Sequence, residues 1–444
     1  MNIHALKSKT MLMWQYRSTS PEADLILSFI MYELDYDIEK QQHIVELLGT
    51  EIDWKKFINI ALDNEILPSV YPILKEFNLG IIPDNIVEYF YKRFERNKQR
   101  NEVLSEELVN LNNLFSSNNI QVINYKGPET VCRLGIDISK RQFNDLYFLF
   151  RHKDISKMND ILSTAGYKLW EDNARHQNLQ RKDFTYIKTA SSNGKPPIRS
   201  LPNDLEEYRE IRIEPHLSIV EYNLPLTIDY DGLWNRAHHI EFMGERIRTF
   251  SKEDLLFILC ISGCKAKWKN LKLIRHIANT LRALPDIDLE ICLERARETG
   301  GEKMLLMGFL LANELMGPVR AFPDTVERAM SEHRLIKHAT KVVYNRSQPK
   351  NKYGLLPSFP AQFSFLIYHT LDRLKDRIKY AWRTCTQPRS VHFRRIPLPK
   401  FLHCLYLLIV PVHDLLIWPI GKIVKRSLSP TRSEGADLYQ HWDG

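Results

Sequence analysis

Residues 121–127, QVINYKG, and residues 141–150, RQFNDLYFLF, decide the fold of this chain. The first segment is a short apolar run that predicts a β-strand ending in Lys126-Gly127. The second predicts another strand, in which Asp145 directly precedes the apolar residues 146–150. A carboxylate in an apolar strand is costly to bury unless a partner or a metal ion compensates its charge. Asp145 is therefore the first residue whose role needs an explanation.

Further strand patterns surround these two segments. The distribution of apolar residues predicts strands over residues 120–125, 144–150, 183–188 and 209–214. A hairpin around Gly244 is predicted to join residues 240–243 to residues 246–250. Residues 154–165 have the periodicity of a helix, and Gly166 stands where its C-cap would be. The middle of the chain is thus expected to form a small sheet.

Helical patterns lie on both sides of this sheet in the sequence. They dominate as far as residue 118 and return after Ser251, which can cap the first of the later helices. One amphipathic helix is predicted over residues 361–382. The predicted fold class is α+β, with the sheet flanked by N-terminal and C-terminal helical regions. The expected division is a helical region over 1–118, an α/β core over 119–250, a helical bundle over 251–345, and a linker with a basic and apolar helical tail over 346–444.

The composition is that of a globular protein with a basic charge balance. Of the 444 residues, 44% are hydrophobic and 26% are charged, which excludes a mainly disordered chain and leaves room for two or three domains. The formal charge of +8 and the pI of about 9.0 favour an anionic partner such as a nucleotide, a nucleic acid or an acidic membrane surface. The sequence contains no basic stripe interleaved with aromatic residues, so a specific nucleic-acid partner is not expected.

The cysteine pattern favours a reducing compartment. Six cysteines are present, and only Cys260 and Cys264 are close in sequence, at helical spacing and without the second pair that a zinc site needs. Buried free thiols in the cytoplasm are the expected state. Residues 1–14 lack the apolar core and cleavage pattern of a signal peptide. We therefore expect a cytoplasmic protein.

The last apolar block, residues 401–420, has two interpretations. Pro411, His413, Asp414 and Pro419 interrupt it, whereas a helix that spans a bilayer needs about 20 apolar residues. A helix packed on the body of the protein is the expected structure. The alternative is an interfacial helix in peripheral contact with a membrane, because basic residues flank the block.

Two acidic residues on predicted strands are candidates for a metal site. Asp145 and Glu214 would face each other at one end of the sheet if their strands are neighbours. Carboxylate oxygens are ligands that Mg²⁺ prefers, together with water and substrate phosphates. Lys126-Gly127 would bring a cation and an open backbone to a polyphosphate, and Arg141 would add a forked donor. The alternative is a structural ion pair between Arg141 and Asp145, with Glu214 as a surface acid.

The order of these motifs resembles a family, the uncharacterised bacterial nucleotidyltransferases related to the polymerase-beta superfamily. Its members have a helical N-terminal region, a strand ending in Leu-Lys-Gly, an Arg-x-x-x-Asp-x-Asp strand, an acid-x-His strand and a helix with His-x-x-Lys-x-x-Trp. The matching segments, in the same order over roughly residues 40–400, are Tyr125-Lys126-Gly127, residues 141–147 (RQFNDLY), Glu214-Pro215-His216 and residues 264–268 (CKAKW).

The resemblance implies a small mixed nucleotidyltransferase-like sheet and an activity. A nucleoside monophosphate would be transferred from a nucleoside triphosphate to an unidentified acceptor, with Mg²⁺ as the cofactor. Asp145 matches the first and Glu214 the third of three metal-binding carboxylates in the family, and His216 matches a His near the third. The matching residues on the phosphate side are Lys126, Gly127 and Arg141.

Lys265 and Trp268 also match the family pattern and have two interpretations. They would line the nucleotide pocket by charge and by stacking on the base. Alternatively, they belong to a basic amphipathic helix whose Trp is anchored in the core.

Three positions depart from the family pattern. Tyr147 replaces the second carboxylate, Ser262 stands where members tend to have His, and His276 stands where they tend to have Asp. A phenol, with an ordinary pKa of about 10, is a poor ligand for Mg²⁺. The resemblance therefore allows only one ion, unless another side chain compensates. The candidates for compensation are His216, Glu129 and Asp137.

Two functions remain open on this evidence. The first is an active, Mg-dependent nucleotidyltransferase. The second is a pseudo-nucleotidyltransferase that binds a nucleotide or a partner protein without turnover.

Overall fold

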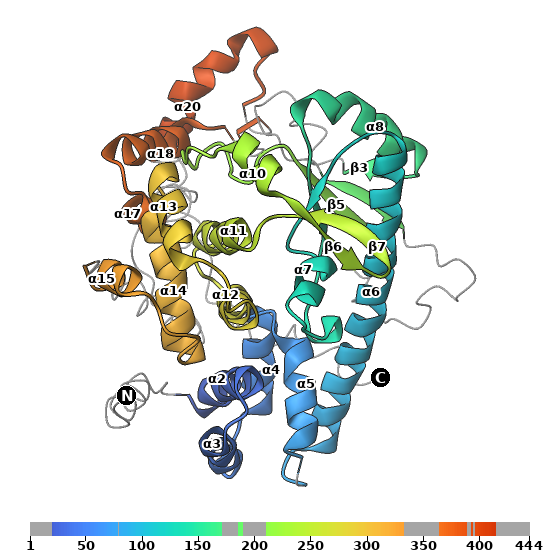
Figure 1. Cartoon of the computed structure of the whole chain (residues 1–444), viewed down its shortest axis with the longest axis vertical. Coiled ribbons are helices and arrows are strands. Elements are labelled where there is room, and N and C mark those ends of the chain that lie inside the picture. The colour runs from blue at the N-terminus through green and yellow to red at the C-terminus, as the bar shows by residue number, and fades with distance from the viewer. Residues whose placement is uncertain are drawn as a thin grey trace, which may run out of the picture.

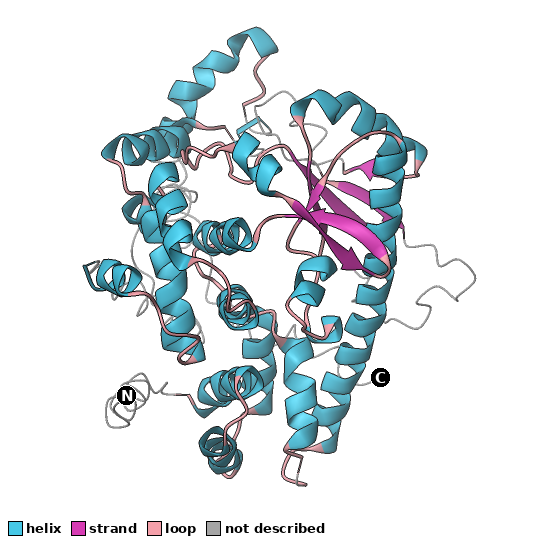
Figure 2. Ribbon diagram, in the orientation of Figure 1, coloured by secondary structure: helices cyan, strands magenta, loops and turns pink. Residues whose placement is uncertain are grey.

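The computed structural model describes residues 20–78, 80–170, 185–189, 210–332, 364–388, 392–393 and 396–413. Within them the protein has the predicted α+β class. Helices precede and follow the strands of a mixed sheet in the sequence. Figure 1 shows the sheet on one side of the molecule, with α6 running beside it and helices α13 to α18 on the other side. The strands form one layer (Figure 2). The first part of the linker and tail expected over residues 346–444, residues 346–363, lies outside the described residues.

The sheet has seven strands in the described part of the chain, in the order β3-β4-β5-β2-β1-β7-β6. Their bounds are β1 (Ile123–Asn124), β2 (Leu146–Leu149), β3 (Lys168–Leu169), β4 (Tyr186–Thr189), β5 (Glu210–His216), β6 (His238–Phe242) and β7 (Glu245–Thr249). The central strand β2 is antiparallel to β1 and parallel to β5. The predicted hairpin is confirmed as β6 and β7, and Gly244 between them has a φ of +80°. The sequence did not predict β3, because two residues are too few to show alternation.

The N-terminal helices precede the sheet. They are α2 (Pro21–Leu34), α3 (Ile38–Leu48), α4 (Trp54–Asp63), α5 (Leu67–Glu76) and α6 (Asp84–Ser117). The carboxylates of Asp37 and Asp53 accept backbone N–H groups at the starts of α3 and α4, which satisfies donors that a helix start leaves open. Pro83 precedes α6, the longest of these helices at 34 residues.

Short helices connect the strands. They are α7 (Pro128–Arg133), η2 (Ile138–Lys140), η3 (His152–Asp154), α8 (Ile155–Thr164) and α10 (Tyr230–Arg236). Gly166 follows α8 with a φ of +85°, as the predicted end of this helix requires.

The C-terminal helices follow the hairpin. They are α11 (Lys252–Lys265), α12 (Leu271–Ala283), α13 (Leu289–Thr299), α14 (Glu302–Met316), α15 (Asp324–Glu332), α17 (Phe365–Thr370), α18 (Leu374–Thr386), η5 (Lys400–Leu405) and α20 (Tyr406–Val412). Ser251 caps α11 as predicted, its Oγ accepting the Asp254 N–H at 3.1 Å. The left-handed Gly300 ends α13.

The single helix predicted over residues 361–382 is wrong in the part that the structure describes. α17 and α18 are separate helices, with Leu371, Asp372 and Arg373 between them. The carboxylate of Asp372 accepts the N–H groups of Glu302 at 2.7 Å and Lys303 at 3.2 Å, so it caps the start of α14. Leu371 is fully buried. These tertiary contacts outweigh the local helical pattern.

Two cores hold the elements together. One contains buried side chains of α2 to α5, the first part of α6 and α11 to α15, so N-terminal and C-terminal helices share it. The other lies between the sheet, α8 and the second part of α6. Phe90 of α6 belongs to the first core, and Leu104 and Phe115 of the same helix belong to the second. α6 therefore fixes the sheet relative to the helices.

Candidate functional site

Strands β2 and β5 bring the two candidate acids to one face of the sheet. Tyr147 pairs with Glu214, and Leu149 pairs with His216. Side chains on a strand alternate between faces, so Asp145 points to the same side as Tyr147. The Tyr147 hydroxyl donates a hydrogen bond to Asp145 Oδ2 at 3.3 Å. The expectation that these strands are neighbours is confirmed.

The carboxyl group of Asp145 is electrostatically unfavourable in its ionised form. Burial, with a further contribution from the negative charge of Glu214, raises its pKa from 3.8 to about 6, and Arg212 opposes the shift. A cation bound beside the two carboxylates would favour the ionised form of Asp145. Asp145 and Glu214 therefore have the chemistry of a hard-cation site.

His216 uses both of its ring nitrogens. Nε2 lies 3.3 Å from Glu214 Oε2, and Nδ1 is hydrogen-bonded to the Tyr125 hydroxyl. Binding of a metal ion by His216 would require one of these contacts to break. The geometry assigns His216 to orienting Glu214.

Tyr147 is the residue that the resemblance matches to the family's second carboxylate. Its ring is largely buried, and burial together with the charges of Glu214 and Asp145 raises the pKa of the phenol well above 10. The described residues contain no group of three or more His, Cys, Asp or Glu side chains that could hold a metal ion. The donor set thus fits one Mg²⁺ held by Asp145 and Glu214, whose other ligands would be water and phosphate oxygens.

The Lys126-Gly127 turn lies beside the acids. Lys126 has a φ of +63°, and its Nζ lies 5.2 Å from the ring centroid of Tyr125 and 5.1 Å from that of Tyr147. Burial, reinforced by the charge of Lys265, lowers its pKa to about 7. A Cβ atom on Gly127 would lie 2.3 Å from Glu129 Oε2, so a larger residue here would displace the Glu129 carboxylate. The turn presents a readily neutralised cation near the carboxylates.

The two other carboxylates considered as metal ligands bind local groups. Glu129 is fully buried, and its Oε1 accepts the Gly127 N–H at 3.2 Å and the Thr130 hydroxyl at 2.8 Å. Burial raises its pKa. Asp137 accepts the Ser139 N–H at 2.8 Å. Both residues stabilise the connector between β1 and β2.

A buried cluster of cations lies between this connector and α12. Arg141 is 3% exposed and Arg275 is 2% exposed. In the described part of the chain, Arg141 Nε and Nη2, Arg275 Nε and His276 Nε2 have no hydrogen-bond partner. The carboxylate of Glu33 pairs with Arg275 Nη2 and lies 3.7 Å from Lys140 Nζ. The cluster therefore has more positive charge and more donors than its protein surroundings satisfy.

The positive charges in and around this cluster act on one another. Burial and the charge of Arg275 lower the pKa of Arg141, with Glu33 opposing the shift. Burial and the charges of Arg141, Lys272 and Lys126 lower the pKa of His276, which is therefore neutral. Arg141 forms no ion pair with Asp145 among the described residues, so the predicted structural pair is wrong. We refer to Arg141 and Arg275, with the neutral His276 beside them, as the cationic cluster.

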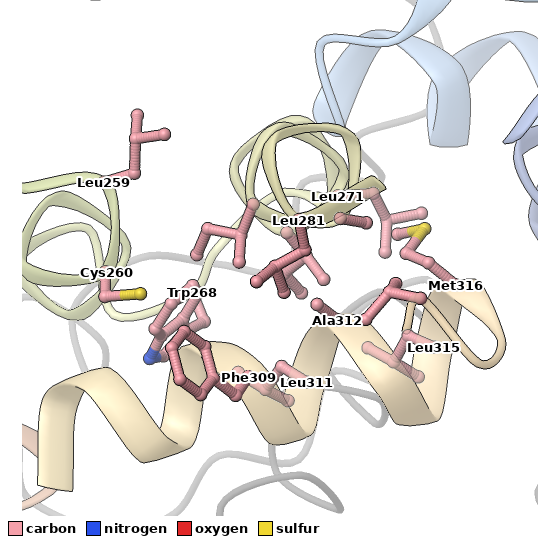
Figure 3. Close-up of a cluster of buried hydrophobic side chains, with 14 of the residues drawn as sticks. Leu259, Cys260, Trp268, Leu271, Leu281, Phe309, Leu311, Ala312, Leu315 and Met316 are labelled. Carbon is pink, nitrogen blue, oxygen red and sulfur yellow. The ribbon is translucent and has the colours of Figure 1, made fainter. Parts of the chain in front are cut away.

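Lys265 and Trp268 have different surroundings. Lys265 Nζ lies 3.3 Å from Glu221 Oε1, near the end of β5. Trp268 is 1% exposed, and Figure 3 shows it beside Phe309 in the buried cluster. A Cβ atom on Gly263 would lie 2.1 Å from the Trp268 ring. In this conformation the Trp is a core residue and is not available to stack on a base.

The sequence did not identify the residues of α6 that position Asp145. Asn97 Nδ2 donates to the carbonyl oxygens of Ser139 and Arg141, both at 2.7 Å. Asn101 Nδ2 also donates to Arg141, at 2.6 Å. Arg100 donates to the carbonyls of Phe143 and Asn144 just before Asp145. The only signal in the sequence was that three polar residues, two of them Asn, stand on the apolar side of a helix.

Fold and site together define a class of protein. It is an α+β protein in which two carboxylates of neighbouring strands lie near a Lys-Gly turn, with buried cations on the connector and on α12. A family model described as "Uncharacterised nucleotidyltransferase" matches residues 50–317, which is more than half of the chain. The chain belongs to this nucleotidyltransferase family. Searches of curated proteins and of solved structures return no match.

Proposed function

We propose that the protein transfers a nucleoside monophosphate from a nucleoside triphosphate to an acceptor hydroxyl, with Asp145 and Glu214 as the ligands of one Mg²⁺. The observation that carries this proposal is the pairing of β2 with β5, which sets Glu214 opposite Tyr147 and on the same face of the sheet as Asp145. The pKa of Asp145, which burial and the charge of Glu214 raise to about 6, supports a cation beside this pair of carboxylates. Such a pair is stabilised by a hard cation. When bound, Mg²⁺ would supply charge stabilisation to the phosphates and acidify the acceptor hydroxyl.

The chain's own residues have separate tasks in this proposal. Lys126, half-neutral near pH 7, takes up a proton when a polyphosphate binds and then pairs with it. The cationic cluster receives phosphate oxygens, because its donors lack partners in the described chain. His216 holds the Glu214 carboxylate in place through Nε2. Six free thiols, all within the described residues, are consistent with the cytoplasm as the location.

The test is a calorimetric titration with each nucleoside triphosphate, first with Mg²⁺ and then with excess chelator. We expect binding that requires Mg²⁺ and weakens at least tenfold in Asp145→Asn and in Glu214→Gln, because each loses a ligand charge. Asp160→Asn, an exposed Asp on α8, is the matched control. Binding that is indifferent to Mg²⁺ and to both variants would contradict the metal site.

Turnover is tested separately by the release of pyrophosphate in the presence of fractionated cell extract as a source of acceptor. Tyr147→Asp restores the second carboxylate of the family pattern and is expected to raise the rate, whereas Tyr147→Phe is the control for lost packing. Mg-dependent binding without pyrophosphate release in either the wild type or Tyr147→Asp would leave a nucleotide-binding pseudoenzyme.

A further inference from the structure

Helix α18 carries its large apolar side chains on the outside. Leu374, Ile378 and Trp382 are 67%, 60% and 64% exposed. They are four residues apart and so lie along one face of the helix. The opposite face is polar and buried, since Asp376, Tyr380 and Thr384 are each 1% exposed. This arrangement is the reverse of a helix that packs on its own protein through its apolar side.

A second set of exposed apolar residues lies on the neighbouring elements. Phe401 of η5 is 79% exposed, and Leu408 and Val412 of α20 are 71% and 50% exposed. Tyr406 and Val410 are buried and anchor α20 to the body, as the sequence predicts for this block up to residue 413. Residues 414–420 lie outside the described residues. α20 lies against α18, at the edge of the molecule away from the N-terminal helices (Figure 1).

The fully exposed charges on these elements are positive. Lys375 and Lys379 are exposed beside the apolar stripe of α18. The acidic residues of α17 to α20 in the described chain are Asp372 and Asp376, and both point inward: Asp372 caps α14 and Asp376 is buried. An anionic surface would therefore meet lysines and apolar side chains and no opposing carboxylate.

We infer that α18, η5 and α20 form a docking surface for an anionic lipid bilayer. α18 has 13 residues, about 20 Å of helix, and is too short to cross a bilayer. No helix in the described ranges is long and apolar enough to span one. A short helix with an exposed apolar stripe flanked by lysines, and with a Trp near one end, lies in the headgroup region. This inference is independent of the nucleotidyl-transfer proposal.

The experiment is co-sedimentation of the full chain with vesicles of phosphatidylcholine alone and of phosphatidylcholine mixed with phosphatidylglycerol. We expect partitioning into the mixed vesicles that falls with added salt and is roughly tenfold weaker in Ile378→Asp, from the loss of one buried Ile. Ile38→Asp is the matched control, because Ile38 is 63% exposed at the start of α3. Lys375→Gln with Lys379→Gln is expected to weaken binding to mixed vesicles only.

Other outcomes would overturn the inference. If Ile378→Asp and Ile38→Asp reduce partitioning equally, or if the wild type does not sediment with vesicles, α18 does not bind lipid. If the wild type dimerises without lipid, as measured by light scattering, and Ile378→Asp abolishes the dimer, the surface contacts a second copy. Thermal unfolding of Ile378→Asp, expected to match that of the wild type, shows whether the variant is folded.

Discussion

At the scale of single residues, the ionisation of Asp145 affects stability and, in the proposed function, metal binding. Its pKa in the folded protein is raised to about 6 from 3.8. Between these values the folded state binds more protons than the unfolded state, so the contribution of Asp145 to stability falls as the pH rises from about 4 to 7. Because one pKa unit corresponds to about 1.4 kcal/mol, the ionised carboxyl costs about 2–3 kcal/mol at neutral pH.

This gives a prediction for Asp145→Asn in a buffer with chelator. The variant is expected to be more stable than the wild type by about 1–3 kcal/mol at pH 7 and equal to it near pH 4. Urea unfolding across this range measures the difference. Added Mg²⁺ should stabilise the wild type and leave the variant unchanged. If the difference in the free energy of unfolding between the two proteins does not vary with pH, the raised pKa of Asp145 is contradicted.

The sequence predicted the candidate residues of the site better than their surroundings. The resemblance pointed to Asp145, Glu214 and Lys126, and the pairing of β2 with β5 places the two acids together. Trp268 was open to two interpretations because its motif does not show that the ring packs against Gly263. The cationic cluster was not predicted beyond Arg141. Its other members stand in α12, and only the fold brings that helix to the connector.

At the scale of elements, α6 positions the start of β2. Asn97 and Asn101 both donate to the carbonyl of Arg141, and Asn101 also donates to Ile138 at 2.7 Å. These carbonyls belong to the turn that precedes Asp145. Because the two amides are buried, removing the Asn101 side chain deletes two hydrogen bonds of this turn, each of which contributes about 1 kcal/mol.

We therefore predict that Asn101→Ala lowers the free energy of unfolding by about 2 kcal/mol and weakens Mg-dependent nucleotide binding. Asn110→Ala is the control, because Asn110 lies on the exposed side of the same helix. Urea unfolding and calorimetry give the two readouts. If Asn101→Ala and Asn110→Ala change stability and nucleotide binding equally, the side-chain hydrogen bonds of α6 do not position the turn before Asp145.

Elements with a regular pattern were predicted well from the sequence. The hairpin, α8 and α11 have clear periodicity and end signals, such as Gly244, Gly166 and Ser251. The break between α17 and α18 was not predictable, because it depends on Asp372 reaching the start of α14, 70 residues away in sequence. Local periodicity contains no information about such a contact.

At the scale of the whole molecule, ion pairs join the N-terminal helices to α12. Glu33 of α2 pairs with Arg275, and Glu65 lies 2.7 Å from Lys272. Removing the charge of a buried partner leaves an uncompensated ion, and such changes cost about 3–5 kcal/mol. Glu33 also acts on the cationic cluster, because its negative charge opposes the lowering of the pKa of Arg141, which lacks an ion pair in the described chain.

Glu33→Gln is accordingly predicted to destabilise the protein by on the order of 3 kcal/mol. Tripolyphosphate should restore part of this loss, and should stabilise the variant more than the wild type, because the anion replaces the missing charge. Glu46→Gln, whose side chain is 77% exposed, is the control. Thermal unfolding with and without tripolyphosphate measures both effects. A variant that tripolyphosphate does not stabilise would count against an anion site at Arg141 and Arg275.

The core that the N-terminal and C-terminal helices share also affects how the chain folds while the ribosome synthesises it. Phe90 and Leu255 belong to one core, yet the ribosome needs roughly 10–30 s to travel from the first to the second at about 5–20 residues per second. During that interval the nascent N-terminal helices display their apolar faces without the helices that later cover them. We expect the growing chain to be a substrate for chaperones that hold nascent polypeptides until α11 to α14 leave the exit tunnel.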